Sequence, residues 1–178
     1  MRISAESQSL NISKAAGILK AGGVVIFPTD TVYGIGCAAD NQKALDRIYK
    51  IKGTPKTQLF PILVSEISQV PKLPPAALTL VKKHWPGALT VILKSGGFRM
   101  PNSKLVKSLI QKAGKPIVGT SANFHGHPAP KSYSQLDPNL VKLADFVIKG
   151  ECKLGIESTV VDATVDPPKV IRLGAVKL

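Results

Sequence analysis

The chain has 178 residues, of which 44% are hydrophobic, so it is long enough to bury a core as one domain over residues 1–178. Its apolar runs are far shorter than the roughly 20 residues of a membrane-spanning helix, and its polar start lacks the apolar stretch of a signal peptide. The two cysteines, Cys37 and Cys152, have no metal or redox spacing. We therefore expect a cytoplasmic protein with no membrane partner.

The charge is strongly positive, because 24 basic residues against 11 acidic ones give a net charge of +13. The basic residues are spread along the chain, which fits an anionic ligand such as a nucleotide or RNA. Lysines far outnumber the four arginines, so a lysine-rich proteome would explain the charge equally well. The charge alone does not decide between these explanations.

The pattern of apolar residues, caps and breakers predicts alternating helices and strands, followed by strands alone. This order predicts an α/β fold, a single domain around a twisted mixed β-sheet flanked by helices. The predicted elements are, in chain order, a helix within 10–23, a strand at 24–28, a helix at 41–53 capped by Asn41 and Gly53, a strand at 60–65, a helix at 74–85, a strand at 88–94, a helix at 103–115 capped by Ser103, a strand at 116–120, a polar loop at 121–130, and short strands within 145–150, 158–163 and 169–175.

The stretch VVIFPTDTVYGIG places hydroxyls and glycines directly after the first buried strand. Thr31 could present a hydroxyl from the strand end, and Tyr33 could stack on a ring or form a hydrogen bond. Gly34 and Gly36 would let a ligand approach the backbone. A tight turn stabilised by Asp30 and the glycines is the alternative interpretation.

Three lysines lie at the end of the second helix, in the segment YKIKGTPK. Lys50, Lys52 and Lys56 could hold phosphates as point charges. Alternatively, they merely complement the helix dipole.

Further polar loops follow later strands. In TSANFHGHPAP, Ser121 and Asn123 could present polar groups to an anion, whereas two histidines without a carboxylate cluster do not predict a metal site. Ser158 begins a strand, and Arg99 and Arg172 lie in short motifs suited to carboxylate or phosphate recognition. The chain contains neither a P-loop motif nor the residue order of an acyl-transfer triad.

Seven segments occur in the order FPTDTVYGIG, IYKIKG, HWPGALTVIL, FRMP, TSAN, GIESTVVD and VIRLGA. Together they make the chain similar to the YrdC family of threonylcarbamoyl-AMP synthases, also called TsaC, over residues 10–176. The resemblance implies an α/β domain with a deep, positively lined concave cavity. It also implies a nucleotidyltransferase that makes L-threonylcarbamoyladenylate from L-threonine, bicarbonate and ATP, with Mg²⁺ arriving with the nucleotide. A separate transferase complex would then modify adenosine in tRNA.

The resemblance also implies a role for individual residues. Lys52 and Arg99 would be catalytic, and Arg99 would pair with the threonine carboxylate beside Thr31 and Tyr33. The residues implied to contact ATP are Lys50, Lys52, Ser121, Asn123, Ser158 and Arg172.

The chain departs from the family pattern after Lys52. Thr54 replaces an arginine, Gln58 and Leu59 change the following positions, and Leu173 replaces a proline. Threonine cannot supply a bidentate guanidinium, so we expect weaker phosphate binding unless Lys50 or Lys56 compensates. The extra C-terminal domain of longer members is not expected in this chain.

Two other functions remain open at this point. A YrdC-like protein without synthase activity could use the same cavity and basic surface, with net charge +13, to bind tRNA or double-stranded RNA. A carbamoyl-handling module like that of hydrogenase maturation proteins is the second, although the fused acylphosphatase and zinc-finger segments of those proteins are not found in the chain.

Overall fold

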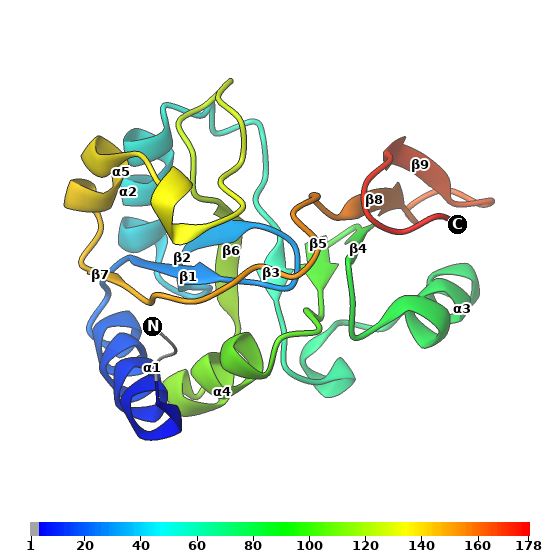
Figure 1. The fold of residues 1–178 in the computed structure, drawn as a ribbon. Coiled ribbons are helices and arrows are strands. Elements are labelled where there is room, and N and C mark those ends of the chain that lie inside the picture. Colours follow the sequence, from blue (N-terminus) through cyan, green and yellow to red (C-terminus); the bar gives the residue numbers. More distant parts are fainter. Residues whose placement is uncertain (1–3) are drawn as a thin grey trace.

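The computed structural model describes residues 4–178, which form an α/β domain built on one mixed sheet (Figure 1). Within these residues the sheet has nine strands in the order β7-β1-β2-β6-β3-β5-β4-β8-β9. The strands are β1 (Val25–Pro28), β2 (Tyr33–Ala38), β3 (Ile62–Leu63), β4 (Leu89–Leu93), β5 (Gly96–Arg99), β6 (Ile117–Ser121), β7 (Phe146–Val147), β8 (Thr159–Asp162) and β9 (Lys169–Arg172). The mixed sheet of the prediction is confirmed, because β1–β7, β3–β5 and β4–β8 pair in parallel and the other neighbours are antiparallel.

Three helices begin and end within two residues of their predicted bounds, whereas the first begins at Ala5 and not near Leu10. Asn41 caps the second helix by accepting a hydrogen bond from the Ala44 N–H at 3.0 Å, and Gly53 ends it with φ 65°. The helices are α1 (Ala5–Lys20), α2 (Gln42–Lys52), α3 (Pro75–His84), α4 (Lys104–Ala113) and α5 (Pro138–Leu143), with 3₁₀ turns at Ile67–Gln69 and Tyr133–Gln135. No helix among residues 4–178 combines the length and apolar character needed to cross a bilayer.

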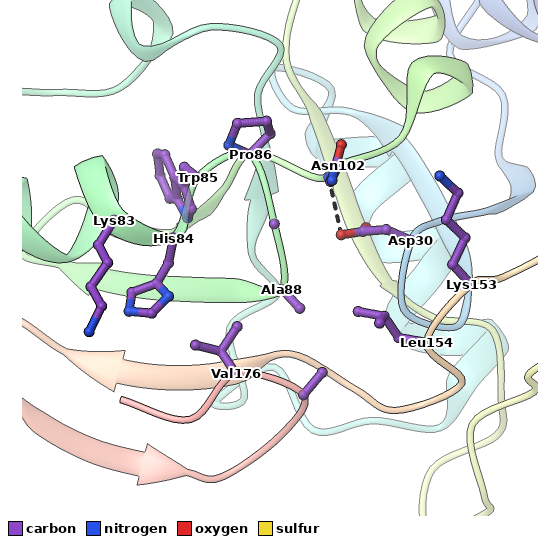
Figure 2. Close-up of a pocket in the computed structure, with 12 residues that line it drawn as sticks. Asp30, Lys83, His84, Trp85, Pro86, Ala88, Asn102, Lys153, Leu154 and Val176 are labelled. Atoms are coloured by element: carbon purple, nitrogen blue, oxygen red, sulfur yellow. Dashed lines mark hydrogen bonds between the residues drawn. The ribbon is translucent and has the colours of Figure 1, made fainter.

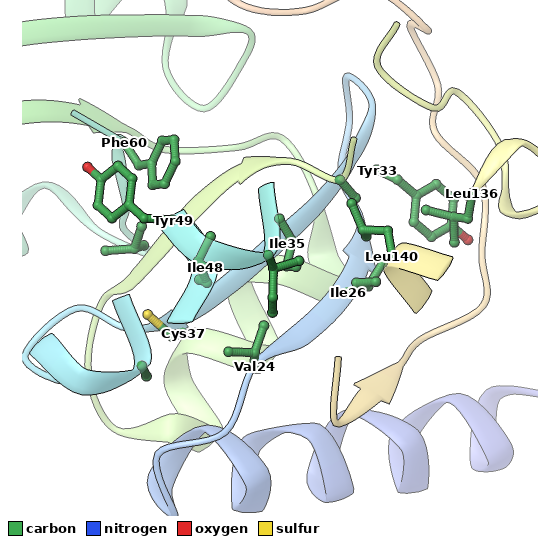
Figure 3. Close-up of a cluster of buried hydrophobic side chains, with 14 residues drawn as sticks. Val24, Ile26, Tyr33, Ile35, Cys37, Ile48, Tyr49, Phe60, Leu136 and Leu140 are labelled. Carbon is green, nitrogen blue, oxygen red and sulfur yellow. The ribbon is translucent and has the colours of Figure 1, made fainter. Parts of the chain in front are cut away.

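Helices cover both faces of the first strands, as Figure 1 shows. Along β1 the side chains alternate, so that Ile26 packs toward α2 and α5 while Val25 and Phe27 pack toward α1 and α4. Figure 3 shows the first of these clusters, in which the rings of Tyr49 and Phe60 stack with centroids 4.4 Å apart. A third cluster packs α3 against β4, β5 and β8. These strands lie in the half of the sheet opposite β7 and β1.

The sequence did not predict β2, β5 or α5. In β2, Gly34 and Gly36 interrupt the apolar pattern of a strand, and the structure shows what replaces their side chains. A Cβ at Gly34 would lie 3.3 Å from the Phe27 ring and 3.4 Å from the Thr120 carbonyl oxygen, and one at Gly36 would collide with the Val118 carbonyl oxygen. The glycines therefore admit Phe27 and the neighbouring strand. Gly34 also borders a cavity, as expected for a ligand site, whereas Gly36 does not border that cavity and the expectation is wrong there.

Candidate functional site

A cavity of about 560 Å³ lies where β2, β4, β5, β6, β8 and β9 converge; we call it the main cavity. Three basic residues and one acidic residue border it, namely Lys94, Arg99, Arg172 and Glu157. A cavity with more basic than acidic residues on its wall is therefore present, as expected. Of the residues predicted for the site, it brings together Thr31, Tyr33, Arg99, Ser121, Ser158 and Arg172.

Arg99 ends β5 and is buried against the turn between β1 and β2. Its guanidinium donates to Asp30 Oδ1 at 2.5 Å and to Thr31 Oγ1 at 3.0 Å, and its Nε donates to the Gly87 carbonyl at 3.1 Å. Burial lowers the pKa of Arg99, and the neighbouring Asp30 carboxylate opposes that shift. Arg99 is therefore a fixed, paired cation at the edge of the main cavity.

Tyr33 borders the main cavity, but its phenol lies on the other side of β2. The ring is fully buried near Leu136 and Leu140 (Figure 3), and its hydroxyl donates to the Gly150 carbonyl at 2.8 Å and accepts from the Gly150 N–H at 2.9 Å. Burial raises the pKa of Tyr33 to about 12. The expectation that this hydroxyl contacts a ligand is corrected, because side chains alternate along a strand and position 33 faces the core.

Ser158 and Arg172 come together across β8 and β9. The Arg172 guanidinium donates to the Ser158 carbonyl at 2.9 Å and pairs with Glu157 at 3.1 Å, while Ser158 Oγ lies 2.9 Å from Thr90 Oγ1. The Arg172 side chain borders the main cavity and is half-exposed.

Lys52, at the end of α2, lies beside a second cavity of about 210 Å³, which we call the Lys52 cavity. The buried ammonium donates to the backbone carbonyls of Ser121 and Asn123, the latter at 2.6 Å, and approaches Asn123 Oδ1 at 3.4 Å. Burial lowers the pKa of Lys52 to about 8, and the charge of Glu157 partly opposes this shift. Ser121 borders both cavities, so these two spaces adjoin.

The other lysines of this segment do not reach either cavity wall. Lys50 is exposed near the end of α2, and Lys56 is exposed and pairs with Asp46 at 2.7 Å. The assignment of Lys50 to ATP and the suggestion that Lys50 or Lys56 compensates for Thr54 therefore do not fit. Helical spacing turns Lys50 away from Lys52, and Lys56 is paired with Asp46. Thr54 itself is buried on the wall of the Lys52 cavity.

A third hollow, of about 310 Å³, lies on the other side of Asp30 and is drawn in Figure 2. Asp30 Oδ2 accepts from the Asn102 N–H at 3.1 Å, so both carboxylate oxygens are engaged. Lys83 and Lys153 lie at opposite ends of this hollow (Figure 2). The Asp30–Arg99 pair thus separates it from the main cavity.

Sequence reasoning missed three residues that shape the site. Asp30 was considered only for local turn contacts, although it anchors Arg99; Thr90 and Glu157 were not considered, although they hold Ser158 and Arg172. For Asp30 the sequence held a signal, because an acidic residue between two threonines directly after a buried strand indicates a partner with positive charge. Nothing in the apolar pattern of β4 distinguishes Thr90, and nothing in the loop before β8 distinguishes Glu157.

Comparisons with known proteins identify the family of the chain. A family model described as Telomere recombination, which covers Sua5, YciO and YrdC proteins, matches residues 17–174. The threonylcarbamoyl-AMP synthase of Bacillus subtilis is 36% identical over 185 residues, covering 93% of this chain and 54% of that protein. The chain thus spans about half the length of this relative.

Two solved structures share the fold. Pyrococcus abyssi Sua5 complexed with L-threonine matches with a TM-score of 0.85 and 31% identity, over 98% of this chain and 56% of that one. Escherichia coli YciO matches with a TM-score of 0.80 and 30% identity, over 94% of this chain and 90% of that one. Since the family model covers most of the sequence and these relatives are 30% to 36% identical, the chain belongs to the Sua5/YciO/YrdC family.

Proposed function

We propose that this protein is a nucleotidyltransferase that makes L-threonylcarbamoyladenylate from L-threonine, bicarbonate and ATP and releases pyrophosphate. The observation that carries this proposal is that the seven segments shared with the family converge on two adjoining cavities. Six of the seven segments contribute residues to the wall of the main cavity, and the remaining one supplies Lys52 to the adjoining cavity. Relatives named threonylcarbamoyl-AMP synthase and a Sua5 structure holding L-threonine support it further.

The reaction needs two bond-forming steps in one enclosed space. The threonine nitrogen attacks the carbon of CO₂ and loses a proton, or attacks that of bicarbonate with loss of water, to give a carbamate. A carbamate oxygen then attacks the α-phosphorus of ATP, and the bond to the pyrophosphate group breaks. Because carbamates are short-lived in water, the site must hold both partners close together and exclude solvent. The cavity of about 560 Å³ between strands supports the proposal, because it would bring the two partners together.

In this proposal, Arg99 holds the threonine carboxylate. A guanidinium has five N–H groups, and the protein uses three of those on Arg99, so two remain for a ligand in the main cavity. The Thr31 hydroxyl lies 3.0 Å from the same guanidinium. Since Asp30 already fixes the orientation of Arg99, the carboxylate would meet a preorganised donor.

The phosphates would lie between Lys52 and Arg172. Developing charge on the α-phosphate calls for fixed cations rather than a covalent nucleophile. Ser121 and Ser158 border the main cavity, and Asn123 lies beside the Lys52 ammonium. Mg²⁺ would enter as part of the nucleotide substrate, since the acid on the cavity wall, Glu157, is paired with Arg172. The residues proposed to act on substrates are thus Thr31, Lys52, Arg99, Ser121, Asn123, Ser158 and Arg172.

The product is a reactive adenylate, so a second protein must use it. We infer a threonylcarbamoyl-transferase complex as that partner and tRNA as the final substrate. Direct contact with RNA through the basic surface, with net charge +13, belongs to the same proposal.

The test is pyrophosphate release from ATP by the purified protein with Mg²⁺ and bicarbonate, with and without L-threonine. We expect release only when threonine is present, and its loss in Lys52→Ala. Lys56→Ala is the matched control, because Lys56 is exposed and borders neither cavity. No release from a folded protein would refute the synthase proposal, and salt-sensitive RNA binding without turnover would support the RNA-binding alternative.

A further inference from the structure

After β9 the chain folds back onto the segment that leads into β8 (Figure 1), and we call residues 173–176 the strap. The Ala175 N–H donates to the Glu157 carbonyl at 2.9 Å. A Cβ at Gly174 would collide with the Glu157 carbonyl oxygen and with the Ser158 backbone. The strap therefore lies in direct contact with the residues that carry Glu157 and Ser158 on the wall of the main cavity.

One side chain, that of Thr159, holds the strap. Its Oγ1 donates to the Val176 carbonyl at 2.7 Å, and it accepts from the N–H groups of Gly174 at 2.9 Å and Val176 at 3.2 Å. A hydroxyl has one donor and two acceptor positions, so these three hydrogen bonds use its full capacity. Thr159 is fully buried and borders none of the three cavities described above. Its hydroxyl therefore binds the strap and has no capacity left for a ligand.

Thr159 is itself fixed to the interior of the sheet. Its backbone N–H donates to the Ala88 carbonyl at 3.0 Å, and it lies opposite Leu89 of β4. By contrast, β9 is the last strand of the sheet, is exposed along its length, and pairs only with β8 among residues 4–178. The Thr159 hydroxyl thus ties the chain beyond an exposed edge strand to a buried one.

The ladder between β8 and β9 is irregular at the end of β9. Val160 lies opposite Arg172, whereas Val161 lies opposite Val170. Ile171 is therefore an extra residue on β9, as in a β-bulge, where the extra residue is unpaired and the strand bends. Because the ladder is interrupted next to Arg172, the contacts of the strap supply the constraint on its other side.

We propose that Thr159 is a positioning residue of the main cavity, whose hydroxyl holds the strap and thereby keeps Arg172 where the nucleotide phosphates would bind. Arg172 directly precedes the strap, and its guanidinium donates to the Ser158 carbonyl at 2.9 Å. Without the Thr159 hydroxyl, the end of β9 can move and the guanidinium moves with it. This inference rests on the proposed function, because that function assigns Arg172 to ATP.

The direct test is calorimetric titration with ATP and Mg²⁺ and, separately, with L-threonine. Thr159→Val removes the hydroxyl at nearly constant volume, and its ATP affinity should fall about tenfold, as expected for a lost contact to a charged group. L-threonine affinity should stay unchanged, because Asp30 holds its proposed partner Arg99. Thr159→Ser keeps the hydroxyl and should bind ATP as the wild type does. Thr164→Val is the matched control, since its hydroxyl bonds to Asp162 outside the strap.

A double-mutant cycle separates positioning from a general loss of structure. In Arg172→Gln the guanidinium is already absent, so adding Thr159→Val should not weaken ATP binding further. The same loss of affinity in both backgrounds would overturn the inference. Unchanged ATP affinity in Thr159→Val would overturn it as well, as would equal losses of ATP and threonine affinity.

The position of Arg172 can also be measured without a ligand. Phenylglyoxal modifies arginine side chains, and mass spectrometry of peptides gives the rate at each of them. We expect Thr159→Val to raise the rate at Arg172 several-fold, because the guanidinium leaves Glu157 and Ser158. The rate at Arg47, which pairs with Asp145, should stay the same and serves as the internal control.

The proposed function therefore fails separately from this inference. If Arg172 reacts faster in Thr159→Val but the wild type neither binds ATP nor releases pyrophosphate with threonine, the role of Thr159 stands and the synthase proposal falls. If threonine-dependent release occurs and the two proteins show equal rates at Arg172, the synthase proposal stands and the inference is overturned.

Discussion

Replacing Asp30 by asparagine tests whether Arg99 is held as a buried, paired cation. The two side chains are 4% and 8% exposed, and their charged atoms lie 2.5 Å apart. Removing one partner of such a pair leaves an uncompensated buried charge and costs about 3–5 kcal/mol. The whole domain is expected to have only about 5–15 kcal/mol of stability. For a chain of this length the loss corresponds to a melting temperature lower by about 6–20 °C.

The measurement is urea and thermal denaturation followed by circular dichroism. Asp40→Asn is the control, because Asp40 and its partner Lys115 are 63% and 41% exposed, and we expect no change in its midpoint. The double variant Asp30→Leu/Arg99→Met should recover much of the loss, since no buried charge remains. A loss below about 1 kcal/mol in Asp30→Asn would contradict the reasoning, because the pair would then not be compensating a desolvated charge.

Three further predictions follow from single residues. Thr54→Val should raise the unfolding free energy by about 1 kcal/mol, because it removes a buried hydroxyl that has no hydrogen-bond partner among residues 4–178. Thr29→Val should lower the unfolding free energy, because the Thr29 hydroxyl donates to a carbonyl at 2.7 Å. If denaturation shows that both variants change the unfolding free energy in the same direction, the reasoning is refuted. The pKa of Lys52 is lowered from 10.5 to about 8, so ATP affinity should fall as the pH rises from 7 to 9.5, and a flat affinity would be contrary evidence. The unfolded chain keeps this proton to higher pH, so the same group makes the unfolding free energy rise with pH between about 8 and 10.5. Tyr33→Phe should lose about 1–3 kcal/mol of stability because the Gly150 backbone loses its partner, while the KM for threonine stays unchanged; a higher KM with unchanged stability would show that the hydroxyl faces substrate.

The sequence was sufficient to predict elements whose ends carry strong local signals. Asn41, Gly53 and Ser103 each stand where a helix begins or ends, and local hydrogen bonds or a positive φ explain why. The strand β2 was missed because Gly34 and Gly36 have low strand propensity. Their place in the sheet depends on the ring of Phe27 from the neighbouring strand, which no local pattern reveals.

The site, too, depends on contacts between distant residues that no local pattern reveals. The residue types for anion binding were visible in the sequence, since arginine, lysine and serine stood in short motifs near strand ends. The direction in which each side chain points was not visible in the sequence, because it depends on strand register and on distant partners. Tyr33 turns toward Gly150, 117 residues away, and Lys50 turns to solvent.

Each proposed cation also joins parts of the cavity wall to one another. Arg99 connects β5 to the turn at Asp30, Lys52 connects α2 to the segment at Asn123, and Arg172 connects β9 to the residues before β8. The groups that would bind substrate therefore also maintain the shape of the cavity. Removing one of them will lower both stability and activity, so lost activity alone cannot establish contact with substrate. Contact is better established by ligand pairs that differ in one group, such as pyrophosphate and AMP, because a general loss of structure weakens the binding of both.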